Sequence, residues 1–406
     1  MKNEYDVIVI GAGPAGSIAA KTAAIRGCSV LLIEKRPEIG VPVRCAEGTS
    51  KTELMKFVDI DPAFICNELH AAVVHAPNGT SFSVTTNMSG IDSEAGIILD
   101  RKIFDRHLAK LAADAGADVY TKTAATGLII EEINNEEKTV AGVVLNHLGE
   151  EIRIRSKIVI AADGIESKIA RMAGIDTTLK LNDIESGVQF LIYDESIRPA
   201  ECEIFLGNEI APGGYIWVFP KGNNTANVGI GISKNRNGKK AIDYLESFMS
   251  EKFPNAKILG TFFGGVPVSG GLEKITANGL MLAGDAARQT DPITGAGIRY
   301  ATYAGEMAGR TAAEAIAAGD CSDKFLKKYQ TEWDQTLGKT IKRNYKIKKA
   351  YDSWTDEEMN HIAKMAAALP LEDFELKEAI VAVLKSDKKL MWKMKGVYYD
   401  LLKSLI

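Results

Sequence analysis

Near its start the chain reads Val7-Ile8-Val9-Ile10-Gly11-Ala12-Gly13-Pro14-Ala15-Gly16, and no other segment says as much about its architecture. A β-branched run too short for a helix leads directly into a G-x-G-x-x-G turn. An alanine-rich helix follows over 17–25, and a second strand over 28–33 ends at Glu34, 23 residues after Gly11. This order of strand, glycine turn, helix, strand and acid is typical of a βαβ unit that binds a dinucleotide.

Each residue of the turn has a physical task. Gly11 permits the tight turn, Gly13 lets backbone N–H groups approach a pyrophosphate, and Gly16 lets the helix pack on the sheet, with Ala15 between them at the helix N-terminus. Glu34 is placed to accept a hydrogen bond from a ribose hydroxyl. The alternative is a glycine-rich connector in an ordinary βαβ unit, which needs no nucleotide.

A second glycine-rich segment indicates which dinucleotide is bound. The strand 279–283 ends at Gly284-Asp285, and the residues Gly295, Gly297 and Ile298 open another alanine-rich helix that runs to about 318. Asp285 is placed to hold a ribityl chain, and a helix N-terminus stabilises the negative charge of a reduced flavin. A nicotinamide enzyme needs no such element, so FAD is the predicted cofactor. The alternative is an aspartate that only caps its helix.

Composition excludes several classes of protein. The chain has 406 residues, 25% of them charged and 46% hydrophobic, which suits a soluble globular protein of two or three domains. A net charge of -4 supplies no field for nucleic acid. Five scattered cysteines and five histidines show no metal-ligand spacing. With no export signal or apolar span apparent, we expect a cytoplasmic protein, with peripheral contact at the inner face of the membrane as an option.

Three segments together resemble the fingerprints of p-hydroxybenzoate hydroxylase-type flavoproteins: the glycine turn with Glu34, the mid-chain Asp163-Gly164, and Gly284-Asp285. Within that superfamily, 215–220 and 229–231 resemble the motif of the geranylgeranyl reductases, and 44–48 resembles the cysteine-containing stretch of their archaeal, lipid-reducing members. The resemblance implies further contacts with the cofactor, from Arg44, Cys45, Ala46, Gly48, Arg101, Ala125, Asp163 and Gly164.

The resemblance also implies a discontinuous α/β architecture. A Rossmann-like FAD-binding domain is expected from 1–65, 96–178 and 268–320. A mostly antiparallel β domain for the substrate is expected from 66–95 and 179–267, followed by a C-terminal helical region, 321–406. Short alternating strands with Asn/Gly turns in the middle of the chain support the β domain independently.

The aromatic motif predicts a groove. Tyr215, Trp217 and Phe219 alternate along one strand, so they share a face. A hairpin loop at 221–225 places Gly231 opposite Tyr215 and Gly229 opposite Trp217, so that large rings lie beside bare backbone. Such a surface suits an elongated apolar substrate. The alternative is an aromatic core strand with incidental glycines.

The resemblance, together with this groove, implies saturation of isolated C=C bonds in a prenylated glycerophospholipid, with a hydride from reduced FAD and a proton from Cys45, Tyr215 or a water. Tyr215 and Trp217 are the predicted catalytic aromatics. Cys45 is a candidate participant in the proton transfer. The alternative is that the loop 44–48 only offers backbone N–H groups to the flavin. The electron donor is NAD(P)H or a ferredoxin-like carrier. A flavin hydroxylase and an electron-transfer flavoprotein without organic substrate remain alternatives.

The C-terminal region predicts helices. Aromatic and aliphatic residues recur every four positions over 325–345, which favours a stripe that packs in the core. The same segment carries a dense basic run that includes Lys342 and Arg343, either a solvated face or a seat for a phosphate head group or an anionic membrane. The last segment, 385–406, mixes apolar residues with lysines and is either a packed helix or an interfacial one.

Overall fold

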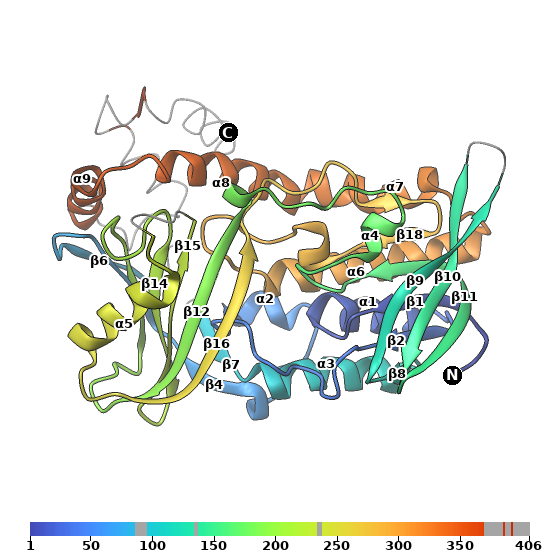
Figure 1. The fold of residues 1–406 in the computed structure, drawn as a ribbon, viewed down its shortest axis with the longest axis horizontal. Helices are drawn as coiled ribbons and strands as arrows, with labels where there is room; N and C mark the ends of the chain where they lie inside the picture. The colour runs from blue at the N-terminus through green and yellow to red at the C-terminus, as the bar shows by residue number, and fades with distance from the viewer. Residues whose placement is uncertain (86–95, 134–136, 234–237, 369–384, 386–390, 393–406) are drawn as a thin grey trace.

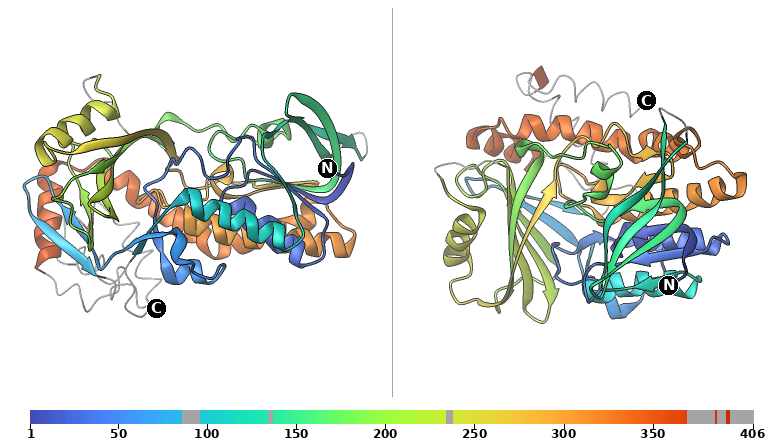
Figure 2. Two further views of the ribbon diagram at one scale, coloured as in Figure 1. Left: turned by 90° about the horizontal axis from the view of Figure 1, so that it is seen from below. Right: turned by 45° about the vertical axis from the view of Figure 1, so that its right-hand side comes forward.

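The computed structural model describes residues 1–85, 96–133, 137–233, 238–368, 385 and 391–392. In Figure 1 two sheets lie towards opposite ends of an elongated molecule, and helices of the C-terminal region run along one side of both. The views in Figure 2 show the same separation of the sheets. The predicted segment 385–406 lies outside the described residues except at 385, 391 and 392.

The first sheet is parallel at its centre. Its strand order is β17-β18-β11-β1-β2-β8, and β9 and β10 extend it through β11 as an antiparallel meander. The bounds are β1 (Glu4–Ile10), β2 (Val30–Ile33), β8 (Asp118–Tyr120), β9 (Thr123–Glu132), β10 (Lys138–His147), β11 (Glu150–Ala161), β17 (Thr276–Ala277) and β18 (Leu280–Leu282). The β-branched run of β1 is buried on both faces, as expected for a central parallel strand.

Helices α1 (Pro14–Ile25), α3 (Arg101–Asp114) and α6 (Ile298–Ala318) pack beside this sheet. Small residues allow α1 and α6 to approach closely. A Cβ at Gly305 would lie 2.3 Å from the carbonyl oxygen of Ala15, and one at Gly309 would lie 2.4 Å from that of Ala19. The alanine and glycine content of both predicted helices therefore reflects their mutual packing.

The second sheet has seven strands in the order β16-β12-β15-β14-β13-β5-β6. All neighbouring pairs are antiparallel except β13 and β5. The bounds are β5 (Ala71–His75), β6 (Ser81–Thr85), β12 (Ile184–Tyr193), β13 (Glu201–Phe205), β14 (Tyr215–Gly222), β15 (Thr225–Ile232) and β16 (Lys257–Pro267). One face packs on α5 (Ala241–Lys252) through a second hydrophobic core, which leaves the other face to the cavity described below.

A small sheet of β3 (Gly48–Ser50), β7 (Gly96–Leu99) and β4 (Ile65–Glu68) lies between the two large ones, beside α2 (Lys51–Met55). The parallel sheet, the mostly antiparallel sheet and the C-terminal helices confirm the predicted fold class. The division of the chain into domains at the predicted boundaries stays a prediction.

The C-terminal helices are α7 (Asp323–Gln335), α8 (Leu337–Tyr351) and α9 (Asp356–Ala367). The predicted apolar stripe is interrupted at Thr336, whose φ of −108° and ψ of −102° separate α7 from α8. The break redirects the chain while Tyr329, Trp333 and Ile341 stay buried in the core of the parallel sheet. Phe325 and Leu337 pack against the same core, whereas Tyr345 is half-buried and donates its hydroxyl to Asp183, so the prediction of a core stripe is confirmed up to Ile341.

Candidate active site

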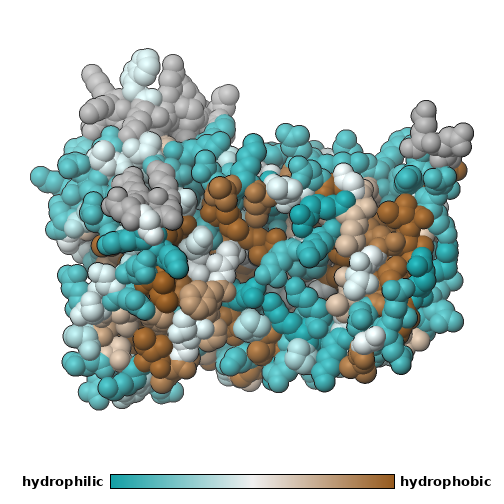
Figure 3. All heavy atoms as spheres, in the orientation of Figure 1, coloured by the Kyte–Doolittle hydropathy of each residue, from teal (hydrophilic) through white to brown (hydrophobic). Residues whose placement is uncertain are grey.

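A single cavity of about 1870 Å³ runs between the glycine turn of the first sheet and the open face of the second. Pockets for one small ligand are usually about 300–1,000 Å³, so this cavity has room for two bound molecules. Figure 3 shows hydrophobic patches that interrupt the hydrophilic surface of the face seen in Figure 1. The cavity joins residues that lie far apart along the chain.

Most of the predicted site residues line this cavity. They are Gly11, Gly13, Ala15, Glu34, Arg44, Cys45, Ala46, Gly48, Arg101, Ala125, Asp163, Gly164, Tyr215, Trp217, Phe219, Gly231, Gly284, Asp285, Gly295, Gly297, Ile298 and Arg343. Gly16 and Gly229 instead pack behind its wall. Lys342 is exposed and forms an ion pair with Asp334 at 2.7 Å, outside the cavity.

The three turn glycines differ in what surrounds them. Gly11 has a φ of +101°, and a Cβ there would meet the carbonyl oxygen of Ala162 at 2.4 Å. A Cβ at Gly16 would lie 1.9 Å from the carbonyl oxygen of Gly11, whereas one at Gly13 would meet nothing within 4 Å. Gly11 and Gly16 are therefore required by the protein itself, and Gly13 keeps the cavity side of the turn open.

Acidic residues follow the carboxyl ends of three parallel strands. Glu34, after β2, accepts the N–H groups of Ala12 at 3.2 Å and Arg36 at 3.0 Å. Asp163, after β11, has a buried Oδ1 without a hydrogen-bond partner among the described residues, and burial raises its pKa. Asp285, after β18, accepts the hydroxyl of Thr290 at 2.8 Å, and burial raises its pKa as well. The edge is thus rich in acceptors for a polar ligand.

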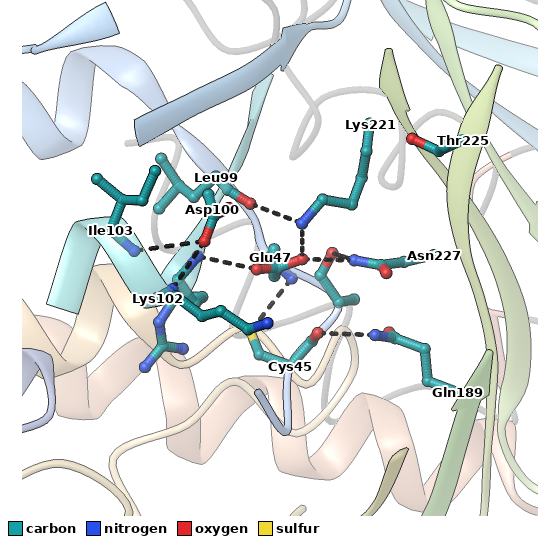
Figure 4. Close-up of polar contacts among 12 residues, drawn as sticks. Cys45, Glu47, Leu99, Asp100, Lys102, Ile103, Gln189, Lys221, Thr225 and Asn227 are labelled. Atoms are coloured by element: carbon teal, nitrogen blue, oxygen red, sulfur yellow. Dashed lines mark hydrogen bonds and ion pairs between the residues drawn. The ribbon is translucent and has the colours of Figure 1, made fainter. Parts of the chain in front are cut away.

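The loop 44–48 is held by a network that the sequence did not predict (Figure 4). At its centre is Glu47, which is 2% exposed and has a φ of 73°. Its carboxylate accepts hydrogen bonds from Asn227 Nδ2 at 2.7 Å and from the Arg101 N–H at 2.9 Å, and it pairs with Lys221. The glutamate lies between residues that the motif did identify, but its partners come from distant elements: Arg101 from α3, Lys221 from β14 and Asn227 from β15.

Cys45 is fixed within the same loop. Its Sγ accepts the N–H of Glu47 at 3.2 Å, and its carbonyl oxygen accepts Gln189 Nε2 at 3.1 Å. Burial raises the pKa of the thiol, against the opposing effect of the nearby Arg101 guanidinium. That guanidinium is anchored by a two-point ion pair with Asp105, at 2.7 Å and 2.8 Å. The thiol therefore stays protonated at neutral pH.

The predicted hairpin register is confirmed. Tyr215 is opposite Gly231, and Trp217 is opposite Gly229. The loop is shorter than expected, a two-residue turn at Asn223 and Asn224 with φ of 51° and 55°, typical of a type I′ turn. An irregularity between Pro220 and Gly222 restores the register and directs Lys221 to Glu47.

The predicted open slot beside the aromatic rings is filled. A Cβ at Gly229 would lie 2.2 Å from Trp217 Cζ2, so the indole rests on the bare backbone of its cross-strand partner. A Cβ at Gly231 would lie 2.7 Å from Glu185 Oε2, so a carboxylate occupies that place. The two glycines therefore make room for protein side chains and not for a ligand. The hairpin sequence does not reveal this, because the cover depends on the rotamer of Trp217 and on Glu185 from the neighbouring strand β12.

An apolar wall that the sequence reasoning missed continues the cavity beyond Trp217. It is built from alternate residues on neighbouring strands and loops, namely Leu69, Ala72, Val74, Phe82, Cys202, Ile204 and Leu206. One sequence signal could have revealed this wall. Residues alternate along β13, so that Cys202 and Ile204 face the cavity and Glu203 does not. Four residues from the C-terminal half of the chain also line the cavity, namely Ile293, Ile347, Tyr351 and Trp354.

The described residues contain no cluster of His, Cys, Asp or Glu able to hold a metal ion. None of the helices among the described residues is long and apolar enough to span a membrane.

Two family profiles match this chain: "FAD dependent oxidoreductase" over residues 6–202 and "Geranylgeranyl reductase catalytic domain" over 183–266. With the fold and the cavity they define an FAD-dependent oxidoreductase. The digeranylgeranylglycerophospholipid reductase of Methanosarcina acetivorans is 51% identical, over 100% of this chain and 99% of that protein, and its namesake from Methanosarcina mazei is 50% identical over the same shares. The chain belongs to this family of reductases.

Solved structures agree. A geranylgeranyl bacteriochlorophyll reductase-like protein from Thermoplasma acidophilum superposes with a TM-score of 0.90 at 38% identity, covering 97% of this chain and 99% of that chain. A flavin-dependent brominase superposes with a TM-score of 0.71 at 19% identity, covering 99% of each chain, and so shares the fold alone.

The residues of the cavity fit FAD. The open side of Gly13 admits a pyrophosphate, and Glu34 lies at the strand end where a ribose is expected. The buried, unpartnered Oδ1 of Asp163 and the buried carboxyl of Asp285 offer acceptors for hydroxyl groups. Gly297 and Ile298, at the start of α6, line the cavity, and the first N–H groups of a helix have no partner within the helix, so they are available to a ligand there.

Proposed function

We propose that this protein saturates the C=C bonds of the geranylgeranyl chains of digeranylgeranylglycerophospholipids, in the synthesis of archaeal membrane lipids. One observation carries the proposal: the dinucleotide site and the apolar sheet face belong to one continuous cavity. A cofactor bound along the glycine turn and a chain lying on β13 and β5 would therefore meet inside the protein.

Bound FAD, once reduced, supplies a hydride to one carbon of an alkene. The protein's own residues bind and orient both partners. Helix α1 would direct its N-terminus at the pyrophosphate, and the loop around Cys45, which lines the cavity, would contact the flavin. Gln189 links that loop to the substrate side, because it donates to the Cys45 carbonyl oxygen and accepts the Trp217 indole N–H at 3.1 Å.

The apolar wall selects a prenyl chain. Each buried methylene contributes about 0.8 kcal/mol to binding, so a long chain gains most of its affinity along β5, β6 and β13. The seven residues of this wall carry no charged group, so the wall favours an apolar chain over a polar aromatic acid. Arg343 lines the same cavity and is the proposed contact for the phosphate head group.

We also propose that the protein contacts the membrane surface through α8. Ile347, Lys348 and Tyr351 line the cavity, while the lysines at 339, 342, 346 and 349 are exposed. Their spacing of three, four and three residues places these lysines on one side of the helix. An anionic lipid surface would attract this face of α8 by about 1 kcal/mol per lysine. The attraction would hold the membrane next to the cavity that the substrate lipids must enter.

Electrons are proposed to arrive from a donor that does not reside on the protein, either NAD(P)H or a ferredoxin-like carrier. Mixing the oxidised protein with each donor under anaerobic conditions and following flavin bleaching identifies the one that reacts. If neither donor bleaches the flavin rapidly, this part of the proposal is wrong.

The test of the function is anaerobic turnover. Protein loaded with FAD and reduced with dithionite is mixed with a digeranylgeranylglycerophospholipid, and the product is analysed by mass spectrometry. We expect two hydrogen atoms added per double bond and reoxidised flavin. A hydroxylase would instead require oxygen and yield a hydroxylated product, and an electron-transfer protein would leave the lipid unchanged.

A further inference from the structure

A buried ion pair lies in the wall of the cavity. Glu185, on β12, faces the cavity, and its Oε1 lies 2.8 Å from Lys348 Nζ on α8. The two side chains are only 8% and 4% exposed. Glu185 Oε2 covers Gly231, the residue directly opposite Tyr215, so the carboxyl group lies beside the strand that carries Tyr215 and Trp217.

The charges of this cluster do not balance. Lys348 Nζ also lies 2.9 Å from Asp352 Oδ1, so two carboxylates share one ammonium group. Burial raises the pKa of Glu185, and the charge of Asp352 raises it further, while Lys348 lowers it. Asp352 does not line the cavity, whereas Glu185 does. Of the two carboxyl groups in the cluster, only that of Glu185 can therefore deliver a proton into the cavity.

The neighbouring phenols are engaged elsewhere. The Tyr215 hydroxyl donates to the carbonyl oxygen of Thr294, and the Tyr351 hydroxyl donates to that of Gly214 at 2.6 Å. Both tyrosines have a pKa raised by burial and by the charge of Glu185. Facing Glu185 are thus Lys348 and Tyr351 from α8, Asp352 directly after α8, and Tyr215 from β14. Glu185 is the carboxylic acid of this set that lines the cavity.

We propose that Glu185 is the acid that protonates the alkene, with Lys348 holding the carboxylate that remains. This inference rests on the proposed function. The π bond of the alkene breaks as one carbon receives the hydride from the reduced cofactor and the other forms a C–H bond with the Glu185 proton. The O–H bond breaks, its electron pair stays on the carboxylate, and water later returns the proton.

The variant Glu185→Gln keeps the shape of the side chain and removes the acid. We expect single-turnover oxidation of the reduced flavin by lipid to slow at least 100-fold, in the range of general acid catalysis, with FAD affinity and the melting temperature close to wild type. The matched control is Asp352→Asn, which removes the carboxylate outside the cavity. It should turn over at low pH.

The pH dependence separates the two variants. An acid must be protonated to act, so the wild-type rate falls as pH rises through the pKa of Glu185. Asp352→Asn lowers that pKa and moves the fall to lower pH, whereas the residual rate of Glu185→Gln shows no such fall. A second readout needs no turnover: with ¹³C-labelled glutamate, the infrared carbonyl band of a buried carboxylic acid should be present in FAD-free wild type and absent in Glu185→Gln.

Unchanged turnover in Glu185→Gln beside an active wild type overturns the inference alone. Wild-type protein that saturates no prenyl chain overturns the proposed function, and the inference with it. If Glu185→Gln does not fold, the wild type decides: its rate must follow the titration of the labelled carboxyl band, and a mismatch overturns the inference.

Discussion

The indole of Trp217 rests on the backbone of Gly229, its cross-strand partner, so closely that a Cβ at residue 229 would stand 2.2 Å from Cζ2. From this position the indole N–H reaches Gln189, which in turn holds the carbonyl oxygen of Cys45. The glycine thereby sets the distance between the substrate wall and the loop at the cofactor.

Substituting Gly229→Ala should displace Trp217. We expect a loss of stability of about 1–3 kcal/mol from overpacking and at least tenfold slower turnover, because Gln189 loses its indole partner. Denaturant unfolding and anaerobic single-turnover kinetics measure the two effects. Gly127→Ala, in another strand where the nearest contact is 3.4 Å, is the matched control and should behave like wild type. An unperturbed Gly229→Ala variant would contradict this packing.

The glycine turn can be dissected into its two roles. Gly13→Ala should leave the stability of the FAD-free protein unchanged, because no atom lies within 4 Å of the new Cβ, while weakening FAD binding at least tenfold. Gly16→Ala should destabilise even the FAD-free protein, because its Cβ would lie 1.9 Å from a carbonyl oxygen. Calorimetry without FAD and fluorescence titration with FAD distinguish them. Equal effects of both variants on the FAD-free protein would refute the assignment.

The Cys45 thiol should react slowly with alkylating agents at neutral pH. Burial raises its pKa, so the reactive thiolate accumulates only as pH rises above the usual thiol range. Labelling of the FAD-free protein against pH, followed by peptide mass spectrometry, measures this. Because Glu185 is the proposed acid, Cys45→Ser should retain single turnover within about tenfold of wild type. A loss of 100-fold or more would make the thiol an essential participant.

Membrane contact should depend on the exposed lysines of α8. The double variant Lys339→Gln, Lys346→Gln removes about 2 kcal/mol of attraction, so binding to anionic vesicles should weaken about 30-fold at low salt. The control is Lys102→Gln, Lys110→Gln on α3, on the opposite side of the molecule in Figure 1. Vesicle co-sedimentation provides the measurement. Equal binding by both double variants would exclude α8 as the contact.

Much of the site was predictable because its signals are local. The positive φ of Gly11 and the contact between Gly16 and Gly11 depend on backbone geometry within a few positions. The pairing of Tyr215 with Gly231 follows from strand alternation and a short loop. The predicted loop was too long, and the strand irregularity at Lys221 compensated for the difference. Register is predictable in a hairpin because its two strands are joined by only a few residues.

The sequence by itself determined the parallel sheet with its glycine turn, the choice of FAD, and the aromatic strand, since each depends on spacing over a short segment. Only the tertiary structure decided what covers Gly229 and which strands build the apolar wall. It also decided that Glu47 pairs with Lys221 and that Glu185 pairs with Lys348. Those partners lie 174 and 163 residues apart, and in both pairs folding brings an ammonium group to a buried carboxylate, which offsets part of the cost of burying the charge. No local sequence pattern predicts these two long-range ion pairs.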